Sequence, residues 1–345
     1  MSSENDLGFW SMASHGASFL NVKTGFSDVV LEYVYQKYLA GHVLRDATGK
    51  SKQFEREDLY MAVAFLKQYP RQGCFDNLAP HHKPRSDRYV RWVVWHTVVF
   101  LADNMVEITV DHFDHPGNHV PHFPEHVVGG VDTFPVFALG GPHRNQPKYK
   151  ANVFKFQAYV SHLGFIGFLS GPHPGAFSDT TLARHYHPRG QRTYLADLAY
   201  VSVPFCLPPH KGDQTAEEEE FTRVHQWYRA RTEHCFAKLH AFSIVDCMYR
   251  GRDLTFLRQC IRMLCSMQNI SLCLRQPYPS YVPTSATTSA RRNPSSYGSG
   301  TGSRTGSSNG SSNGSSSRPG SSSRPGSSSR PARTTATTQR TTESC

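Results

Sequence analysis

A series of apolar, strand-like runs that ends in one long amphipathic helix most constrains the fold of this chain. The runs cover residues 127–139, 151–162, 164–170 and 192–197, and Leu163-Gly164 supplies a turn between the second and the third. The helix is predicted from Thr215 onward, because residues 215–218 (TAEE) match a capping box and the Glu side chains favour the positive end of a helix. This order predicts an α/β domain in which helices flank a sheet.

The long helix carries an acidic residue away from its apolar stripe. Glu233 lies well off the stripe at 100° per residue, and Arg229 is one turn before it. On an exposed helix such a pair is an ordinary salt bridge, so the helical pattern alone leaves the role of Glu233 open. The stripe consists of Phe221, Val224, Tyr228, Cys235, Leu239 and Phe242.

Two further acids accompany Glu233. Asp132 lies inside the first apolar run, where an unpaired charge would be costly, and Asp197 ends the run at 192–197. The alternatives are a water-facing Asp132 where Pro135 weakens the ladder, and Asp197 as an ordinary turn residue. Carboxylate oxygens are the ligands that Mg²⁺ prefers, so the three acids are candidate metal ligands.

Five ordered motifs between residues 127 and 270 resemble the catalytic domain of Harbinger-type DDE transposases and their DDE-superfamily endonuclease relatives. They are residues 131–135 (VDTFP), 147–157 (PKYKANVFKFQ), 170–179 (SGPHPGAFSD), 195–200 (LADLAY) and 228–239 (YRARTEHCFAKL). Two departures are visible: Thr133 follows the first Asp where many relatives have Gly, and Leu198-Ala199 replaces the usual residues before Tyr200.

The resemblance implies an RNase H-like fold with the first acid on a central strand and the second on an adjacent one. It implies that Asp132, Asp197 and Glu233 are catalytic and bind a divalent cation, Mg²⁺ or Mn²⁺, for two-metal cleavage of DNA. Asp179, in the third motif, is expected as an accessory residue and competes with Asp197 for the place of second ligand.

Three helices are predicted ahead of this domain, at residues 27–40, 56–68 and 86–104. They resemble the helix-turn-helix segment that precedes the catalytic domain in Harbinger-type proteins, with Arg88 and Arg91 as candidate phosphate contacts. The alternative is a helical cap whose aromatic stripe is core. The predicted domains are a segment at 1–24, a helix-turn-helix-like region at 25–105, the nuclease domain at 106–282 and a tail at 283–345.

The tail consists almost entirely of Ser, Thr, Gly, Arg and Pro, and the hexamer GSSSRP begins at Gly314, Gly320 and Gly326. Such a composition predicts disorder, because it cannot bury enough apolar surface to offset the loss of entropy. Of the net charge of +10, eight Arg and one Glu in residues 284–345 supply +7 and residues 1–283 only +3. The tail is therefore either a DNA-binding polycation or a solubilising segment.

Four lysines of the nuclease domain are further candidates for holding the DNA backbone: Lys148, Lys150, Lys155 and Lys238. Solvent-facing strand lysines are the alternative. The His-rich loop at residues 111–126 is expected to be a solvated loop rather than a zinc site, because three prolines break any regular spacing of its His residues.

The chain is expected to be intracellular. None of the eight Cys forms a Cys-x-x-Cys pair, which favours buried reduced thiols, and no secretory signal or membrane-length apolar run is evident. Nuclear localisation follows if the protein acts on chromosomal DNA.

Two functions remain open at this point. The first is a metal-dependent DDE endonuclease or transposase. The second is a host-adopted, catalytically inactive DNA-binding or scaffolding protein descended from one; a nuclease acting on RNA is a weaker third. DNA is the expected partner, no membrane is involved, and a homo-oligomer and a separate DNA-binding protein are both left open.

Overall fold

The computed structural model describes residues 22–45, 51–71, 74–78, 85–139, 145–146 and 151–275. All of them lie in the unit Met1–Thr287. The remaining residues, including the predicted tail, lie outside the described ones.

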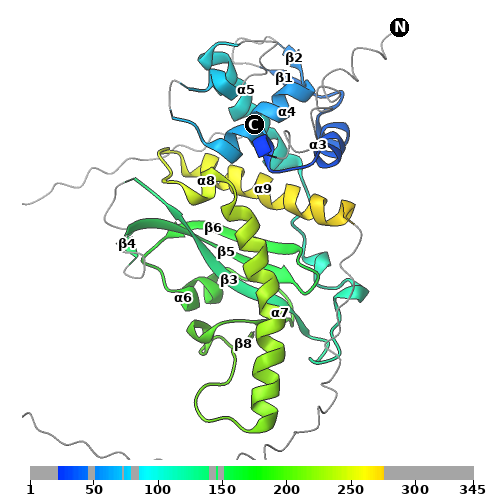
Figure 1. Ribbon diagram of the computed structural model, residues 1–345, viewed down its shortest axis with the longest axis vertical. Coiled ribbons are helices and arrows are strands. Elements are labelled where there is room, and N and C mark those ends of the chain that lie inside the picture. Colours follow the sequence, from blue (N-terminus) through cyan, green and yellow to red (C-terminus); the bar gives the residue numbers. More distant parts are fainter. Residues whose placement is uncertain are drawn as a thin grey trace, which may run out of the picture. The chain divides into compact units, whose positions relative to one another are not determined.

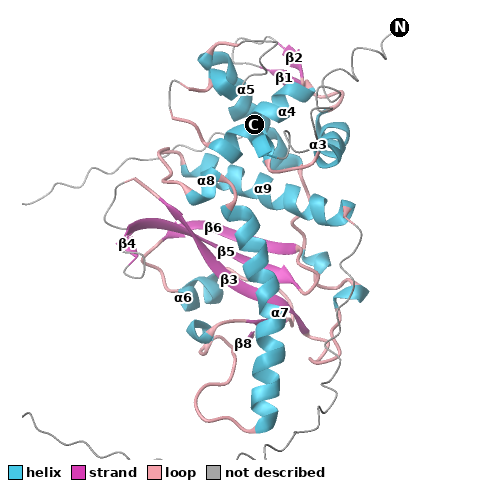
Figure 2. Cartoon of the chain, in the orientation of Figure 1, coloured by secondary structure: helices cyan, strands magenta, loops and turns pink. Residues whose placement is uncertain are grey.

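A mixed sheet forms the centre of the region from residue 127 onward (Figures 1 and 2). Its order is β4-β5-β3-β7-β8, and β6 pairs with β5. The central strand β3 runs antiparallel to β5 and parallel to β7. The strands are β3 (Val127–Phe137), β4 (Asn145–Gln146), β5 (Ala151–Ser161), β6 (Ile166–Pro174), β7 (Thr193–Leu195) and β8 (Cys206–Leu207). This arrangement confirms the predicted α/β class with helices around a mixed sheet.

Strand β6 corrects one sequence prediction. The apolar run predicted at residues 164–170 ends too early, because β6 continues through a Pro- and Gly-rich stretch to Pro174 and pairs with β5 there. Its partner positions are Phe154 and Lys155 on β5. A strand at the edge of a sheet tolerates Pro because one side of its backbone needs no ladder hydrogen bond.

The helices ahead of the sheet match their predicted ranges closely. The range 56–68 is confirmed as α4 (Arg56–Gln68), and 86–104 as α5 (Asp87–Asn104), whose N-cap Ser86 accepts from the backbone N–H of Tyr89. The first range divides into α3 (Asp28–Val34) and a π-helical turn (Tyr35–Leu39), and a short hairpin of β1 (Val43–Arg45) and β2 (Ser51–Gln53) follows. Whether this region reads DNA as a helix-turn-helix stays a prediction.

The predicted boundary after residue 105 falls at the end of α5, where no break in the core occurs. Side chains of α4 and α5, such as Phe65 and Val98, share one buried hydrophobic cluster with Phe134 of β3 and Phe156 of β5. Helix α9 (Leu254–Leu274) joins the two parts, because it contacts both α5 and β6. The short helix α8 (Ser243–Asp246) contacts α4 and β3.

The long helix α7 (Ala216–His240) crosses one face of the sheet (Figure 1). It begins with the predicted capping box, in which Thr215 accepts from the backbone N–H of Glu218. Its close approach to β3 depends on Gly130, where a Cβ would lie 2.5 Å from Oγ1 of Thr232. The glycine therefore lets the helix settle on the central strand beside Asp132.

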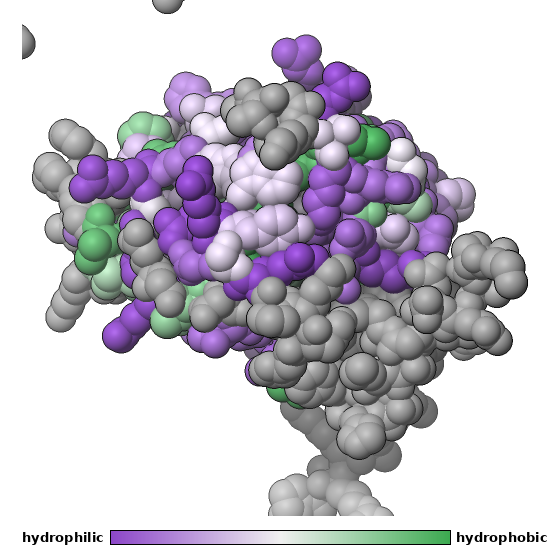
Figure 3. All heavy atoms as spheres, turned by 90° about the horizontal axis from the view of Figure 1, so that it is seen from above, coloured by the Kyte–Doolittle hydropathy of each residue, from purple (hydrophilic) through white to green (hydrophobic). Residues whose placement is uncertain are grey.

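The face seen from above in Figure 3 is mainly hydrophilic, with hydrophobic residues in small separate patches. Among the described cysteines all are free thiols, and Cys206, Cys235, Cys260 and Cys265 are buried as expected, whereas Cys247 and Cys273 are exposed. No helix among the described residues is both long and apolar enough to cross a bilayer.

Candidate active site

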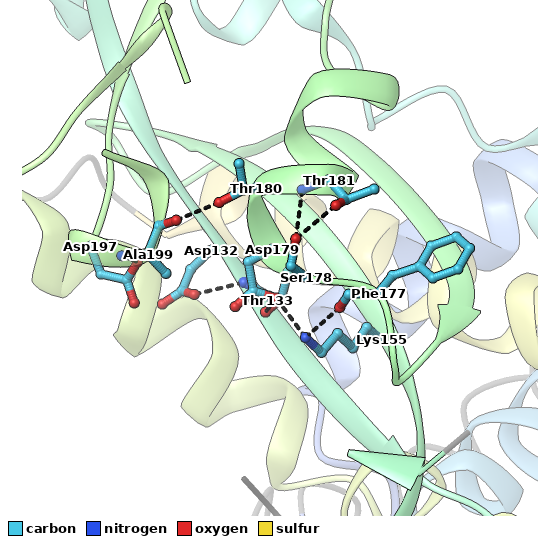
Figure 4. Close-up of polar contacts among 10 residues, drawn as sticks. All are labelled: Asp132, Thr133, Lys155, Phe177, Ser178, Asp179, Thr180, Thr181, Asp197 and Ala199. Atoms are coloured by element: carbon cyan, nitrogen blue, oxygen red, sulfur yellow. Dashed lines mark hydrogen bonds and ion pairs between the residues drawn. The ribbon is translucent and has the colours of Figure 1, made fainter. Parts of the chain in front are cut away.

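The pairing of β3 with β7 places Asp132 and Asp197 at matching positions. Gly130 of β3 is in register with Leu195 of β7, and each acid follows two residues later on its own chain segment. Because the two strands are parallel, both segments continue in the same direction. Figure 4 shows the two carboxylates pointing toward one another.

Asp197 is held in place by the turn that follows β7. It is the N-cap of the 3₁₀ turn Leu198–Tyr200, and its Oδ1 accepts from the backbone N–H of Ala199 at 2.9 Å. The carbonyl of Ala199 in turn accepts from Oγ1 of Thr180. The turn that carries Asp197 is thus tied to the start of α6 (Asp179–His185).

Asp132 is partly buried, with 22% of its side chain exposed. Burial raises its pKa from 3.8 to about 6. The backbone N–H of Thr133, at 2.7 Å from Oδ1, and the charge of Arg229 lower this pKa, whereas the charges of Asp197 and Asp179 raise it. Asp132 therefore stands in a field of excess negative charge.

Asp179 lies beside this pair but is held by its own partners (Figure 4). Its Oδ1 accepts from Oγ1 of Thr133 at 2.9 Å and from Nζ of Lys155 at 2.8 Å. Ser178, not Asp179, is the N-cap of α6, because its side chain accepts from the backbone N–H of Thr181. Because Ser178 caps the helix, the Asp179 carboxylate can make its contacts with Thr133 and Lys155 instead.

Tyr200 is a buried residue close to all three aspartates. Its side chain is fully buried, and burial raises the pKa of its hydroxyl well above 10. The charges of Asp132, Asp179 and Asp197 all raise that pKa further. The three carboxylates therefore lie within electrostatic reach of one buried phenol.

Glu233 reaches Asp132 only through an arginine. Arg229 donates from Nη1 to Oδ2 of Asp132 at 3.2 Å and from Nη2 to Oε1 of Glu233 at 2.5 Å. The i, i+4 salt bridge that was the ordinary alternative for Glu233 is present, and the same guanidinium also binds Asp132. Arg229 thus stands as a cation between two predicted metal ligands.

As these side chains stand, no three His, Cys, Asp or Glu residues within the described part of the chain lie close enough to hold a metal ion. The donors themselves are suitable for a hard cation, since all are carboxylate oxygens. The excess negative charge around Asp132 is also what a cation would relieve. Asp132 and Asp197 are brought together, Asp179 is bound to Lys155, and Glu233 is joined to Asp132 through Arg229.

The predicted DNA contacts fall in different places. Lys155 was expected at the surface, but its side chain is only 4% exposed and binds Asp179 and the carbonyl of Phe177. Lys238 lines a pocket between α7 and α9, and Arg88 and Arg91 are exposed in the first turns of α5, where Arg91 pairs with Asp87. Lys148 and Lys150 lie outside the described residues.

Two residues that contribute to the site were not identified from the sequence. Thr133, noted only as a departure from the motif, binds Asp132 through its N–H and Asp179 through its hydroxyl. Arg229 was noted only as a neighbour of Glu233, although the R-x-x-x-E spacing does put its guanidinium on the Glu233 side of the helix. Its second contact, with Asp132, follows from tertiary packing.

Residues 145–269 match the model of a family described as DDE superfamily endonuclease. The match includes Asp179, Asp197 and Glu233, and Asp132 lies just before it. No curated protein and no solved structure matches the chain. The family match supports a relationship to DDE-superfamily endonucleases. Asp132 lies outside the matched residues, and the pairing of β3 with β7 brings it to the position that matches Asp197.

Proposed function

We propose that this protein is a metal-dependent DNA endonuclease of the DDE type, with an RNase H-like catalytic domain at residues 106–282. The observation that carries the proposal is the pairing of Asp132 with Asp197 at matching positions of two parallel segments. The family match to residues 145–269 adds the reaction class. The Harbinger type, and with it a role as a transposase acting in the nucleus, belongs to the same proposal.

Asp132 and Asp197 are the first two proposed ligands of Mg²⁺ or Mn²⁺. Asp197 is favoured over Asp179 as the second ligand, because Lys155 and Thr133 already engage the Asp179 carboxylate. When bound, the cation would act as a Lewis acid and activate water for attack on a phosphodiester. Asp179 keeps the accessory role of fixing Thr133, and through it the backbone that binds Asp132.

Glu233 completes the proposed ligand set only if Arg229 releases it. The guanidinium now neutralises Asp132 and Glu233 together, as a divalent cation between them would. The guanidinium and a divalent cation would compete for the same carboxylate oxygens, so Arg229 would turn away from them when the metal is bound. After this movement its positive charge would remain close to a bound DNA backbone.

The test is strand cleavage of supercoiled and repeat-end DNA with Mg²⁺ or Mn²⁺. Asp132→Asn keeps the size of the side chain but removes its charge, so nicking should fall by about a thousandfold or more, equivalent to about 4 kcal/mol of barrier. Asp114→Asn is the matched control, because Asp114 pairs with Arg192 away from the site. Its nicking should equal that of the parent.

Thermal melting with and without Mn²⁺ separates failure of catalysis from failure of binding. The parent should melt at a higher temperature with the metal, and Asp132→Asn should respond less. Nicking that survives in Asp132→Asn would place the activity elsewhere. A parent protein with neither nicking nor a metal-dependent shift would be the adopted, non-catalytic descendant.

A further inference from the structure

The outer edge of β6 borders a groove of about 800 Å³, called the β6 groove below. Residues 167–173 all line it, and α9 contributes Leu254, Thr255, Arg258 and Arg262 to its other side. Side chains of a strand alternate between the two faces of a sheet, so a cavity lined by seven consecutive residues runs beside the edge of the strand. Figure 1 shows β6 as the strand of the sheet nearest to α9.

One residue of this edge is already paired with an amide that takes the place of a further strand. Asn269 of α9 is fully buried, and its Oδ1 accepts from the backbone N–H of Ile166 at 2.9 Å. Its Nδ2 donates to the carbonyl of Ile166, also at 2.9 Å. Both backbone groups of Ile166 therefore face away from β5. A peptide backbone could make the same two contacts, because it too carries a donor and an acceptor.

The backbone of Leu169 points in the same direction, at a place where the edge is open. Strand β5 pairs with β3 in an unbroken register over residues 153–161, so its residues alternate regularly in direction. Val160 and Ala158, which pair with Ile166 and Leu169, are two residues apart and point the same way. Leu169 therefore turns its N–H and C=O toward the groove, and no described residue is hydrogen-bonded to them there.

Two arginines give the groove a positive side. Arg258 is exposed and Arg262 is half-buried, and none of the described residues that line the groove is acidic. Arg258 lies near His173, whose pKa is lowered by burial and by the charge of this arginine. The two arginines are one helical turn apart, about 6 Å along α9. Residues i and i+2 of an extended strand are separated by nearly the same distance, about 6.6 Å.

An extended peptide fits this edge better than nucleic acid does. The C=O of Leu169 needs a donor, and a peptide backbone supplies donors and acceptors together, whereas a phosphodiester backbone offers acceptors alone. This chain is a poor source of such a peptide. Its run of four Glu at residues 217–220 belongs to helix α7, and residues 284–345 carry eight Arg and one Glu. The groove therefore suits an acidic segment of another protein.

We propose that the β6 groove binds an extended, acidic peptide of a partner protein. The peptide adds a strand to the outer edge of β6 and exchanges backbone hydrogen bonds with Leu169. Two of its carboxylates, on residues i and i+2, bind Arg258 and Arg262 through charge-assisted hydrogen bonds. Its alternate side chains are apolar and face Phe168 and Tyr186, which also line the groove. This binding is separate from the proposed cleavage of DNA and does not require it.

Fluorescence anisotropy with the full chain tests the groove with a defined probe. The probe is a fluorescein-labelled peptide of seven residues in which Val and Glu alternate, so that its Glu side chains share one face. Two peptides serve as controls: one has Lys in place of Glu, and one has every backbone nitrogen methylated. Each should bind at least about tenfold more weakly than the probe, because the first reverses the charge and the second cannot donate to β6. A methylated peptide that binds as tightly as the probe would rule out strand addition.

Charge reversal tests the role of the two arginines. Arg258→Glu with Arg262→Glu should weaken binding of the probe about tenfold or more and should make the Lys peptide the tighter ligand. The matched control, Arg189→Glu with Lys211→Glu, reverses two exposed cations outside the groove and should leave both affinities unchanged. Melting temperature and circular dichroism establish that each variant is folded, and if the double variant is not, the exposed Arg258→Glu alone should weaken the probe about threefold. Unchanged binding of the probe by a folded variant would contradict the proposal.

Hydrogen exchange locates the bound probe and identifies its rivals. At saturating probe, exchange of the Leu169 amide, followed in fragments that cover residues 166–174, should slow about tenfold, and exchange along α7 should not change. If a duplex DNA protects this amide and the probe does not, the groove is a nucleic-acid surface and the proposal is wrong. A parent that sediments as a dimer and an Arg258→Glu, Arg262→Glu variant that sediments as a monomer would make a second copy the occupant instead. None of these measurements depends on nuclease activity.

Discussion

Arg229 and Arg231 stand two residues apart on α7 and lie in different surroundings. Arg229 binds Asp132 and Glu233, and Lys155 binds Asp179 close by. Arg231 stacks over Trp227 at 4.8 Å and lines a pocket together with Leu163, Lys238 and Leu272. Two residues of a helix point about 200° apart, so one helix separates the two environments.

The difference shows that the role of a cation depends on the acids around it. On the sheet side, acids outnumber cations, and each nearby cation is engaged in holding them. On the other side of α7, Arg231 and Lys238 line one largely apolar pocket. The same residue type therefore compensates an acidic cluster on one side of α7 and lines a largely apolar pocket on the other.

The largest effect on stability should come from removing the buried cation of the acidic side. Lys155→Met would take the neighbouring cation away from Asp179, which would keep its hydrogen bond from Thr133, at a cost of about 3 kcal/mol. Lys238→Met, the same change on the other side of α7, should cost well under 1 kcal/mol, because the side chain of Lys238 is partly exposed. Urea unfolding of both variants measures the contrast.

Asp179→Asn provides the control for this interpretation. Removing the acid together with the lysine relieves the uncompensated charge, so the double variant should recover part of the stability lost in Lys155→Met. Equal destabilisation by Lys155→Met and Lys238→Met would mean that the two sides of α7 do not differ as described.

The sequence predicts the framework of this site better than its contacts. Capping residues and periodicity located α4, α5 and α7 within a residue or two, because those signals are local. Burial of Lys155 was not predictable, since alternation along β5 leaves open which face of the sheet a helix or loop will cover. The double contact of Arg229 likewise depends on Gly130, which sets how closely α7 approaches β3.

The second prediction concerns how stability depends on pH, and it tests only the side of α7 that faces Asp132. The folded chain holds the proton of Asp132 more tightly than the unfolded chain, with a pKa of about 6 against 3.8. The stability that this group contributes is therefore present below about pH 4 and is lost as the pH rises through 6, on the order of 2–3 kcal/mol. In metal-free buffer, Asp132→Asn should gain stability over the parent across this range.

Melting curves of the two proteins between pH 4 and pH 7 measure this difference. Glu220→Gln gives the opposite sign, because the hydrogen bond from Arg223 lowers the pKa of Glu220 and its contribution is lost as the pH falls. If the melting temperatures of the parent and of Asp132→Asn changed in parallel over the whole pH range, carboxylates would not be crowded around Asp132.

The third effect compares the two arginines directly. Arg229→Gln removes the guanidinium that occupies Asp132 and Glu233, so Mn²⁺ should bind roughly tenfold more tightly. Arg231→Gln lies on the other side of the helix and should leave the affinity unchanged. Calorimetric titration of both variants measures it, and weaker binding by Arg229→Gln would mean that Arg229 positions Glu233 for the metal instead of competing with it.

The smallest effect on stability should follow removal of residues 284–345. These residues include eight Arg but almost no large apolar side chains, so the melting temperature should change by less than about 2 °C. DNA binding should weaken mainly at low salt, because the lost contacts are cationic and non-specific. A truncation that lowered the melting temperature by much more than this would show that residues 284–345 stabilise the rest of the chain, and the contrast between the two sides of α7 would then no longer come from α7 and its neighbours alone.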